Sequence, residues 1–381
     1  MNQHINVMII PTNFCNMDCV YCFHNSHNKN MEKMSLNTLE KLMSVIIPAY
    51  EQVTFIWHGG EPLSMGMEFY KKALEYEEKY GKENKKIENL MQTNLTLLTD
   101  ELAEFLIKNG FKLGSSYDGI QNEITRGKSS EILNGRNILK SHGGNCGVIQ
   151  VVSKKNVTSL IESYEFFKKR NINYSLNMYI SDSENDDELA LDIEEYIERV
   201  NELFDYWLMD KSSNVRITLF REIIGFILFN RKSICTYCSC MGHWLAVRPQ
   251  GDIYPCNRFF PKQYEMGNIW DYDTADKIFE SQGYIRLLKK AIERREKCKK
   301  CEIYKFCEGG CNNNALNENG IENNGGNSCR SLIQIYKHIY AKISQILSNK
   351  IEIAETNLWI QEQIKDYIQM ENEKESVEYE F

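Results

Sequence analysis

Three cysteines near the N-terminus are spaced so that they can hold a metal cluster. Cys15, Cys19 and Cys22 lie in the stretch Cys-Asn-Met-Asp-Cys-Val-Tyr-Cys, and no fourth cysteine is close to them in the sequence. A four-iron cluster takes four thiolates when protein alone ligates it, so a compact set of three leaves one iron open. The spacing therefore predicts a cluster with one exchangeable position, which is a site for chemistry and not only for electron transfer.

The composition is that of a globular enzyme. The chain has 381 residues, is 42% hydrophobic and 26% charged, and carries a formal net charge of −8. This charge argues against general binding to nucleic acid or to anionic membranes, and the sequence shows neither a signal peptide nor an apolar run of membrane-spanning length. We expect a cytoplasmic protein whose 13 cysteines stay reduced, which favours metal ligation over disulfide bonds.

Short apolar strands alternate with helical patterns over the first half of the chain. Six strands are predicted near Val7–Ile10, Val53–Trp57, Ile87–Met91, Phe111–Tyr117, Gly147–Ser153 and Tyr174–Ile180. Repeated βα units predict an α/β fold with a parallel sheet, here a partial (β/α)6 barrel of the TIM type. In such folds reactive groups gather on the loops after the strands, and the cysteine triplet follows the first strand.

Polar and glycine-rich segments follow the next three predicted strands. Two adjacent glycines after the second strand admit close approach of a ligand to the backbone, and Glu61 can accept hydrogen bonds from a cationic amine. The same segments could also be ordinary turns and helix caps. The candidate ligand-binding residues are Gly59, Gly60, Glu61 and Pro62 after the second strand, Gln92 and Asn94 after the third, and Ser116 and Asp118 after the fourth.

Nine further cysteines lie late in the chain. Five of them fall in a stretch rich in Lys, Gly and Asn that has little apolar core, so bound metal must supply much of its order. Others precede or end a predicted hairpin from Trp244 to Cys256, which turns at Gln250-Gly251. The set has the size that two more four-iron clusters require, with one thiol left over, and structural zinc is the alternative. Its members are Cys235, Cys238, Cys240, Cys256, Cys298, Cys301, Cys307, Cys311 and Cys329.

The cysteine triplet, with Tyr21 between its last two members, and the Gly-Gly-Glu-Pro segment resemble the radical SAM superfamily. The resemblance implies that S-adenosylmethionine chelates the open iron, that Gly-Gly-Glu-Pro contacts its ammonium group, and that Phe23 lies against the adenine. It also implies reductive cleavage of S-adenosylmethionine to a 5′-deoxyadenosyl radical, with the three cysteines as catalytic residues. Tyr21, Gln92, Asn94, Ser116 and Asp118 are expected as further cofactor contacts. A zinc knuckle completed by His24 and His27 is the alternative for the triplet.

The order of the late cysteines resembles the SPASM domain found behind the barrel in related enzymes. The resemblance implies one auxiliary cluster on Cys240, Cys256, Cys311 and Cys235, with Cys238 as the alternative to Cys235. It implies a second on Cys298, Cys301, Cys307 and Cys329, which makes three [4Fe-4S] clusters in all. We predict a radical SAM barrel over 1–230, a SPASM domain over 231–335, and a C-terminal helix with an acidic tail over 336–381.

The layout is similar to anaerobic sulfatase-maturating enzymes, with one departure. Asn257 stands directly after Cys256, where those enzymes carry an aspartate proposed as the base, and an amide cannot take up a proton. We therefore predict a maturase of the sactipeptide or ranthipeptide kind, which forms thioether bonds in a cysteine-rich ribosomal precursor peptide. Sulfatase maturation is the alternative among enzymes, and a structural or redox-sensing iron–sulfur protein is the alternative outside them.

The predicted partners follow from that activity. A flavodoxin- or ferredoxin-type protein is expected as the electron donor. Because the first strand begins by Asn6, we expect no N-terminal domain for a leader peptide, so another surface or a separate protein would recognise the substrate.

Overall fold

The computed structural model describes residues 3–24, 31–81, 85–181 and 188–378, which form two compact units. The first unit comprises Met1–Tyr117, Asn122–Gly147 and Cys240–Arg294, and the second comprises Asp118–Gln121, Val148–Ser239 and Arg295–Phe381. Each unit is assembled from segments that are distant in the sequence. The domain boundaries after residues 230 and 335 stay a prediction.

The first unit is built on a sheet with the strand order β4-β3-β2-β1-β7-β8. Its parallel part consists of β1 (His4–Ile9), β2 (Gln52–Trp57), β3 (Lys86–Gln92) and β4 (Lys112–Ser116). β7 (Trp244–Val247) pairs in parallel with β1 and antiparallel with β8 (Ile253–Tyr254), so the predicted hairpin forms and joins the main sheet. The buried residues Leu245, Ala246 and Val247 of β7 explain this position, because they need apolar cover.

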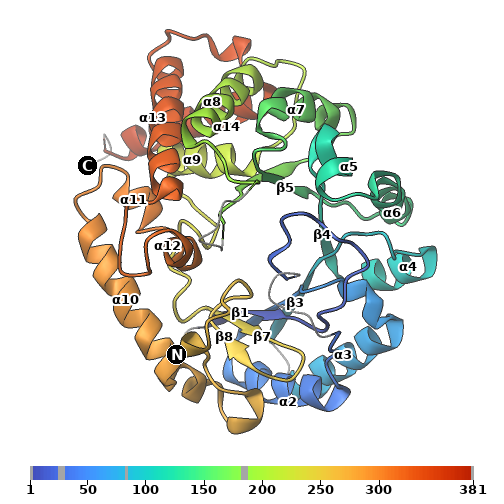
Figure 1. The fold of residues 1–381 in the computed structure, drawn as a ribbon. Coiled ribbons are helices and arrows are strands. Elements are labelled where there is room, and N and C mark those ends of the chain that lie inside the picture. The colour runs from blue at the N-terminus through green and yellow to red at the C-terminus, as the bar shows by residue number, and fades with distance from the viewer. Residues whose placement is uncertain (1–2, 25–30, 82–84, 182–187, 379–381) are drawn as a thin grey trace. The chain divides into compact units, whose positions relative to one another are not determined.

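Helices α2 (Leu36–Ile46), α3 (Met67–Tyr80) and α4 (Asp100–Lys108) lie beside this sheet (Figure 1). Alternate residues of β1 are buried against this cover, and the helices contribute buried leucine, methionine and aromatic side chains to the same core. Ser35 and Thr99 cap α2 and α4 by accepting hydrogen bonds from Thr38 N and Leu102 N, as their sequence positions predict. The remaining helices are α5 (Asn122–Thr125), α6 (Ser129–Ser141) and α10 (Gln282–Cys298), which continues into the second unit.

The second unit combines two parallel strands with a helical core. The strands are β5 (Val148–Val152) and β6 (Tyr174–Met178). Helices α8, α9 and α13 lie side by side (Figure 1), and Ile339, Ile343 and Ile346 of α13, which lies partly in the predicted C-terminal helix, are buried. The helices are α7 (Leu160–Lys169), α8 (Ile193–Leu208), α9 (Thr218–Phe229), α11 (Tyr304–Cys307), α12 (Asn312–Glu318), α13 (Asn327–Leu347) and α14 (Leu358–Glu378).

All six strands predicted for the first half of the chain are present, and the α/β class with parallel strands is confirmed. Within the described ranges, none of the helices combines the length and the hydrophobicity that crossing a bilayer requires.

Glu77 of α3 makes the stability of the first unit depend on pH. Its two carboxylate oxygens accept hydrogen bonds from Asn89 Nδ2 at 2.9 and 3.1 Å, and Asn89 Oδ1 accepts one from Trp57 Nε1 at 2.8 Å. Burial raises the pKa of Glu77 from 4.5 to about 7, while the Asn89 hydrogen bond acts in the opposite direction. The folded protein therefore binds this proton more tightly than the unfolded chain does.

We expect the free energy of unfolding to fall through this group as the pH rises from about 4.5 to about 7, by about 2–3 kcal/mol. Glu77→Gln should remove this loss, whereas Glu75→Gln on the exposed side of α3 should keep it. Urea denaturation at pH 5.5 and pH 8 would measure the difference. Equal pH dependence in the two variants would contradict the assignment.

Candidate active site

The predicted cluster cysteines lie together on the loop that follows β1. Burial raises the pKa of the Cys15 thiol, the Met17 N–H hydrogen bond to it lowers that pKa, and the Cys22 thiol raises it. Cys22 N donates to Cys19 O at 3.0 Å, which closes the second half of the loop. All three thiols are partly exposed. Cys15 and Cys22 are therefore near enough to interact electrostatically, and a backbone amide points at the first sulfur.

The Gly-Gly-Glu-Pro segment after β2 lies directly on the cysteine loop. Gly60 N donates to Thr12 O at 3.0 Å, and Glu61 N donates to Phe14 O at 2.7 Å. A Cβ atom on Gly60 would stand 2.1 Å from Phe14 O, so only glycine fits at this position. Gly59 has a φ of +110°, a conformation that glycine alone adopts readily. The two glycines thus bring the loops into backbone contact.

Glu61 connects this segment to the loop after β3. Its carboxylate is 1% exposed and accepts hydrogen bonds from Thr93 Oγ1 at 2.6 Å, Asn94 N at 2.8 Å and Leu63 N at 2.9 Å. Burial raises the pKa of Glu61, and these three donors lower it. An ionised carboxylate offers about four acceptor positions, so about one is left for a ligand amine. Thr93 was not among the predicted site residues, although it adjoins Asn94.

Asn94 extends the same network to the cysteine loop. Its side-chain amide donates to Asn16 Oδ1 at 2.9 Å and lies 3.9 Å from Cys15 Sγ. Its Oδ1 accepts from Thr96 N and Thr96 Oγ1. The loops after β1, β2 and β3 therefore share one set of hydrogen bonds around Cys15.

Three other predicted cofactor contacts, Gln92, Ser116 and Asp118, do not all belong to the same unit. Gln92 Nε2 donates to Ser116 Oγ at 2.9 Å, which joins the ends of β3 and β4 in the first unit. Asp118 belongs to the second unit, where its fully buried carboxylate accepts a hydrogen bond from Val151 N at 2.9 Å. At least one oxygen of Asp118 is therefore used to hold β5. Its role as a cofactor contact stays a prediction.

Two basic residues that sequence reasoning missed bind the cysteine loop. Arg126 Nη1 donates to Tyr21 Oη at 2.8 Å, and its guanidinium lowers the pKa values of Cys15 and Glu61. Lys128 Nζ donates to Asn16 O at 2.8 Å. Both flank Gly127 just after the short helix α5, a stretch that reads as an ordinary turn. The sequence signal for these two residues was a basic side chain on each side of Gly127, shortly after the fourth predicted strand.

Aromatic and histidine side chains line one side of the cysteine loop. Phe23 packs on His24 with 4.3 Å between ring centroids, and Phe260 lies 6.2 Å from Phe23. His58 lies 5.8 Å from His24, and its Nδ1 accepts a hydrogen bond from Gly59 N at 2.7 Å. Burial lowers the pKa of His58 to about 4, so this imidazole is neutral at pH 7. His24 thus packs among rings, and His27 lies outside the described residues.

Four of the late cysteines gather in the second unit. Burial and, after it, the neighbouring thiols of Cys329, Cys298 and Cys301 together raise the pKa of Cys307 to about 12. Backbone N–H groups of Gly309 and Gly325 point at the sulfurs of Cys307 and Cys329. These four are the set predicted for the second auxiliary cluster. The other predicted set draws on both units, with Cys240 and Cys256 in the first and Cys235 and Cys311 in the second.

These donor sets suit iron–sulfur clusters. The thiols of Cys15, Cys307 and Cys329 receive backbone N–H hydrogen bonds, which is typical of cluster ligands. In the described part of the chain, no three His, Cys, Asp or Glu side chains form a group that could hold a single metal ion. Thiolates that ligate four separate irons stand farther apart than thiolates that share one zinc ion, so the two kinds of site differ in geometry.

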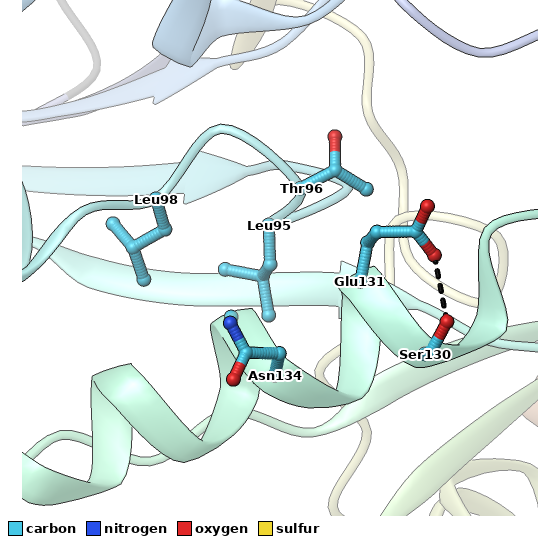
Figure 2. Close-up of a pocket in the computed structure, with 7 residues that line it drawn as sticks. Leu95, Thr96, Leu98, Ser130, Glu131 and Asn134 are labelled. Carbon is cyan, nitrogen blue, oxygen red and sulfur yellow. Dashed lines mark hydrogen bonds between the residues drawn. The ribbon is translucent and has the colours of Figure 1, made fainter.

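A small open pocket of about 270 Å³ lies between the loop after β3 and helix α6. Figure 2 shows the hydrogen bond between Ser130 and Glu131 on one side of the pocket, with Leu95 and Leu98 on the other. None of the predicted cofactor contacts lines this pocket, so it is separate from the candidate active site. Its lining residues are Leu95, Thr96, Leu98, Ser130, Glu131, Asn134 and Gly135.

Comparison with known proteins gives two family matches. The family model of the Radical SAM superfamily matches residues 9–196, and that of SPASM, an iron–sulfur cluster-binding domain, matches residues 238–302. The first match contains the cysteine triplet and Gly-Gly-Glu-Pro. The second contains five of the late cysteines, which are Cys238, Cys240, Cys256, Cys298 and Cys301.

The other four late cysteines, Cys235, Cys307, Cys311 and Cys329, lie outside the SPASM match.

Relatives of known activity extend over most of the chain. A cysteine-type anaerobic sulfatase-maturating enzyme of Clostridium perfringens is 26% identical over 91% of this chain and 99% of that enzyme. A serine-type enzyme of Bacteroides thetaiotaomicron is 28% identical over 87% of this chain and 89% of that enzyme. A solved structure described as native anSMEcpe with bound AdoMet and Cp18Cys peptide has a TM-score of 0.80 at 25% identity, covering 91% of this chain and 99% of that one.

The contact between Gly60 and Phe14 can be tested directly. Gly60→Ala should push the two loops apart and weaken S-adenosylmethionine binding to the cluster-loaded protein, because overpacking of this kind costs about 1–3 kcal/mol, or about 5- to 150-fold in affinity. Equilibrium binding measures the effect, with iron content as the check on loading.

Gly225→Ala in α9 is the matched control, since a Cβ there would meet its nearest neighbour at an ordinary 3.5 Å. A Gly60→Ala protein with full iron content and unchanged affinity would show that the backbone contact does not shape the site.

Proposed function

Because the chain belongs to the radical SAM superfamily and carries a SPASM domain, we propose that it oxidises a residue of a peptide substrate with the help of S-adenosylmethionine. The observation that carries the proposal is the backbone contact of Gly-Gly-Glu-Pro with the loop of Cys15, Cys19 and Cys22. The solved relative with AdoMet and a peptide bound supports both the cofactor and the substrate class.

Residues of the first unit suit the zwitterionic end of S-adenosylmethionine. Glu61 keeps about one acceptor position for an ammonium group, and the Arg126 guanidinium supplies the opposite charge for a carboxylate. Gly59 and Gly60 leave the backbone accessible to the ligand. Together with a cluster held by Cys15, Cys19 and Cys22, S-adenosylmethionine would supply the abstraction of a hydrogen atom from the substrate.

The proposal includes auxiliary clusters and an external electron donor. Two further four-iron clusters would be held by the late cysteines, as the SPASM match supports. A flavodoxin- or ferredoxin-type protein would deliver the electron. A cytoplasmic location belongs to the same proposal, since reduced thiols suit a reducing compartment.

Formylglycine formation is the first candidate for the product. The similarity to the two sulfatase-maturating relatives covers 91% and 87% of this chain, and 99% and 89% of those enzymes. In this reaction a cysteine or serine side chain would lose one hydrogen atom from carbon, one proton from sulfur or oxygen, and one electron to an iron–sulfur cluster. Serine would then carry the aldehyde, whereas the thioaldehyde of cysteine would react with water and release hydrogen sulfide.

Thioether formation is the second candidate, and Asn257 favours it. Asn257 is 6% exposed, and its Oδ1 accepts a hydrogen bond from Cys256 Sγ at 3.4 Å. An amide cannot serve as the base that formylglycine formation needs. A thiol that binds metal gives up its proton on binding, so a thioether can form without a carboxylate base.

Mass spectrometry of peptides treated with the reduced enzyme and S-adenosylmethionine separates these candidates. We expect a cysteine-containing sulfatase peptide to exchange sulfur for oxygen, and Asn257→Asp to raise that rate by about 10²-fold or more, the usual contribution of a general base. Loss of two hydrogen atoms from a cysteine-rich precursor peptide, with sulfur retained, would instead establish the thioether.

Cys19→Ala is the control for both products. It should abolish the formation of 5′-deoxyadenosine, because the cluster would lose a ligand. Persistent 5′-deoxyadenosine in this variant would overturn the proposed function.

A further inference from the structure

Lys232 binds the segment around Cys307, one of the late cysteines. Its Nζ donates to Lys305 O at 3.0 Å and to Phe306 O at 3.1 Å, and it forms an ion pair with Glu308. The side chain is 15% exposed. The two carbonyls belong to the last turn of α11, whose final residue is Cys307. Lys232 therefore caps the carboxyl end of the helical turn that presents Cys307.

The segment that contains Lys232 is itself fixed from two sides. Glu222 of α9 is 4% exposed and accepts hydrogen bonds from Ser233 N at 2.6 Å, Ser233 Oγ at 2.6 Å and Ile234 N at 3.3 Å. Tyr237 packs on Phe306 with 4.5 Å between ring centroids. The ammonium group is thus held in place and does not depend on the metal for its position.

We propose that Lys232 is a positioning residue for the iron–sulfur cluster that Cys298, Cys301, Cys307 and Cys329 would hold, and that its charge raises the reduction potential of that cluster. The inference rests on the proposed function only in assigning a cluster to these four cysteines. Lys232 would order the segment that carries Cys307 and would raise the reduction potential of the bound cluster.

Charge decides the direction of the effect. A reduced cluster carries one more negative charge than an oxidised one, so a nearby cation favours reduction and a nearby anion opposes it. Glu308 follows Cys307 directly and offsets part of the charge of Lys232. Both side chains act on the Cys238 thiol, where Lys232 lowers the pKa and Glu308 raises it, so the two charges have opposite effects on a nearby sulfur. Removing one partner leaves the other charge unbalanced.

A redox titration followed by electron paramagnetic resonance tests the proposal in the full chain, without peptide or S-adenosylmethionine. Lys232→Met should move the auxiliary cluster about tenfold toward its oxidised form, which is about 59 mV for a one-electron couple. Glu308→Gln should move it in the opposite direction, and the double variant should lie between the two. Lys232→Arg, which keeps the charge, should stay close to the wild type.

Lys168→Met is the matched control. Like Lys232, Lys168 is a part-buried lysine of the second unit that forms an ion pair. It lies in the last turn of α7 and pairs with Asp210 at 2.5 Å, so its removal should leave the potential unchanged. Unchanged potentials in both Lys232→Met and Glu308→Gln would overturn the proposal, and so would shifts of the same sign, which indicate a loosened loop. If the Lys232→Met protein does not load iron, the Glu308→Gln shift tests the proposal. A shift toward the reduced form supports it, and a shift toward the oxidised form overturns it.

The proposed function fails by a different observation. An enzyme without activity on peptides but with these opposite shifts would keep the role of Lys232. Cys307→Ala with an unchanged iron content would show instead that these cysteines hold no cluster, and would overturn the role of Lys232 with it.

Discussion

The backbone contact between the Gly-Gly-Glu-Pro segment and the cysteine loop is the constraint on which the candidate site depends. A loop that carries three cysteines has little apolar surface to order it, so neighbouring backbone must hold it. Gly60 makes this possible because it has no side chain, and Glu61 then continues the connection to the loop after β3 through Thr93 and Asn94. The position of Cys15 is therefore set by hydrogen bonds that exist without metal, as expected for the surroundings of a ligand.

Both groups of cysteines use a lysine in the same way. Lys128 Nζ binds the carbonyl of Asn16, which follows Cys15, and Lys232 Nζ binds the carbonyl of Phe306, which precedes Cys307. A cluster brings several thiolate charges into a partly buried place, where uncompensated charge is costly. An ammonium group on the adjacent backbone carbonyl fixes the loop and offsets part of that charge. The same physical demand thus explains two lysines that belong to different units.

The strands and the cysteine motifs could be predicted from the sequence because both are local patterns. Short runs of five to seven residues, most of them with buried apolar side chains at alternate positions, form β1 to β6, and the spacing of the thiols is visible without a structure. Asp118 shows where local patterns fail. An aspartate before a glycine has the same sequence whether its carboxylate accepts a hydrogen bond from a ligand or from Val151 N. Arg126 was missed for a similar reason, because its partner Tyr21 lies about a hundred residues away. The pairing of β7 with β1 also depends on the tertiary structure alone.

His58 and Asn257 limit the acid–base chemistry that the candidate site can perform. His58 is uncharged at pH 7, and its Nδ1 already accepts the Gly59 N–H, so the remaining ring nitrogen carries the proton and can only donate. Asn257 offers an amide that cannot be protonated under ordinary conditions. Neither side chain can therefore take a proton from a substrate thiol. If the chain performs the reaction of its sulfatase-maturating relatives, the proton must leave by another route, and if a metal-bound thiolate is the reacting species, no such route is needed.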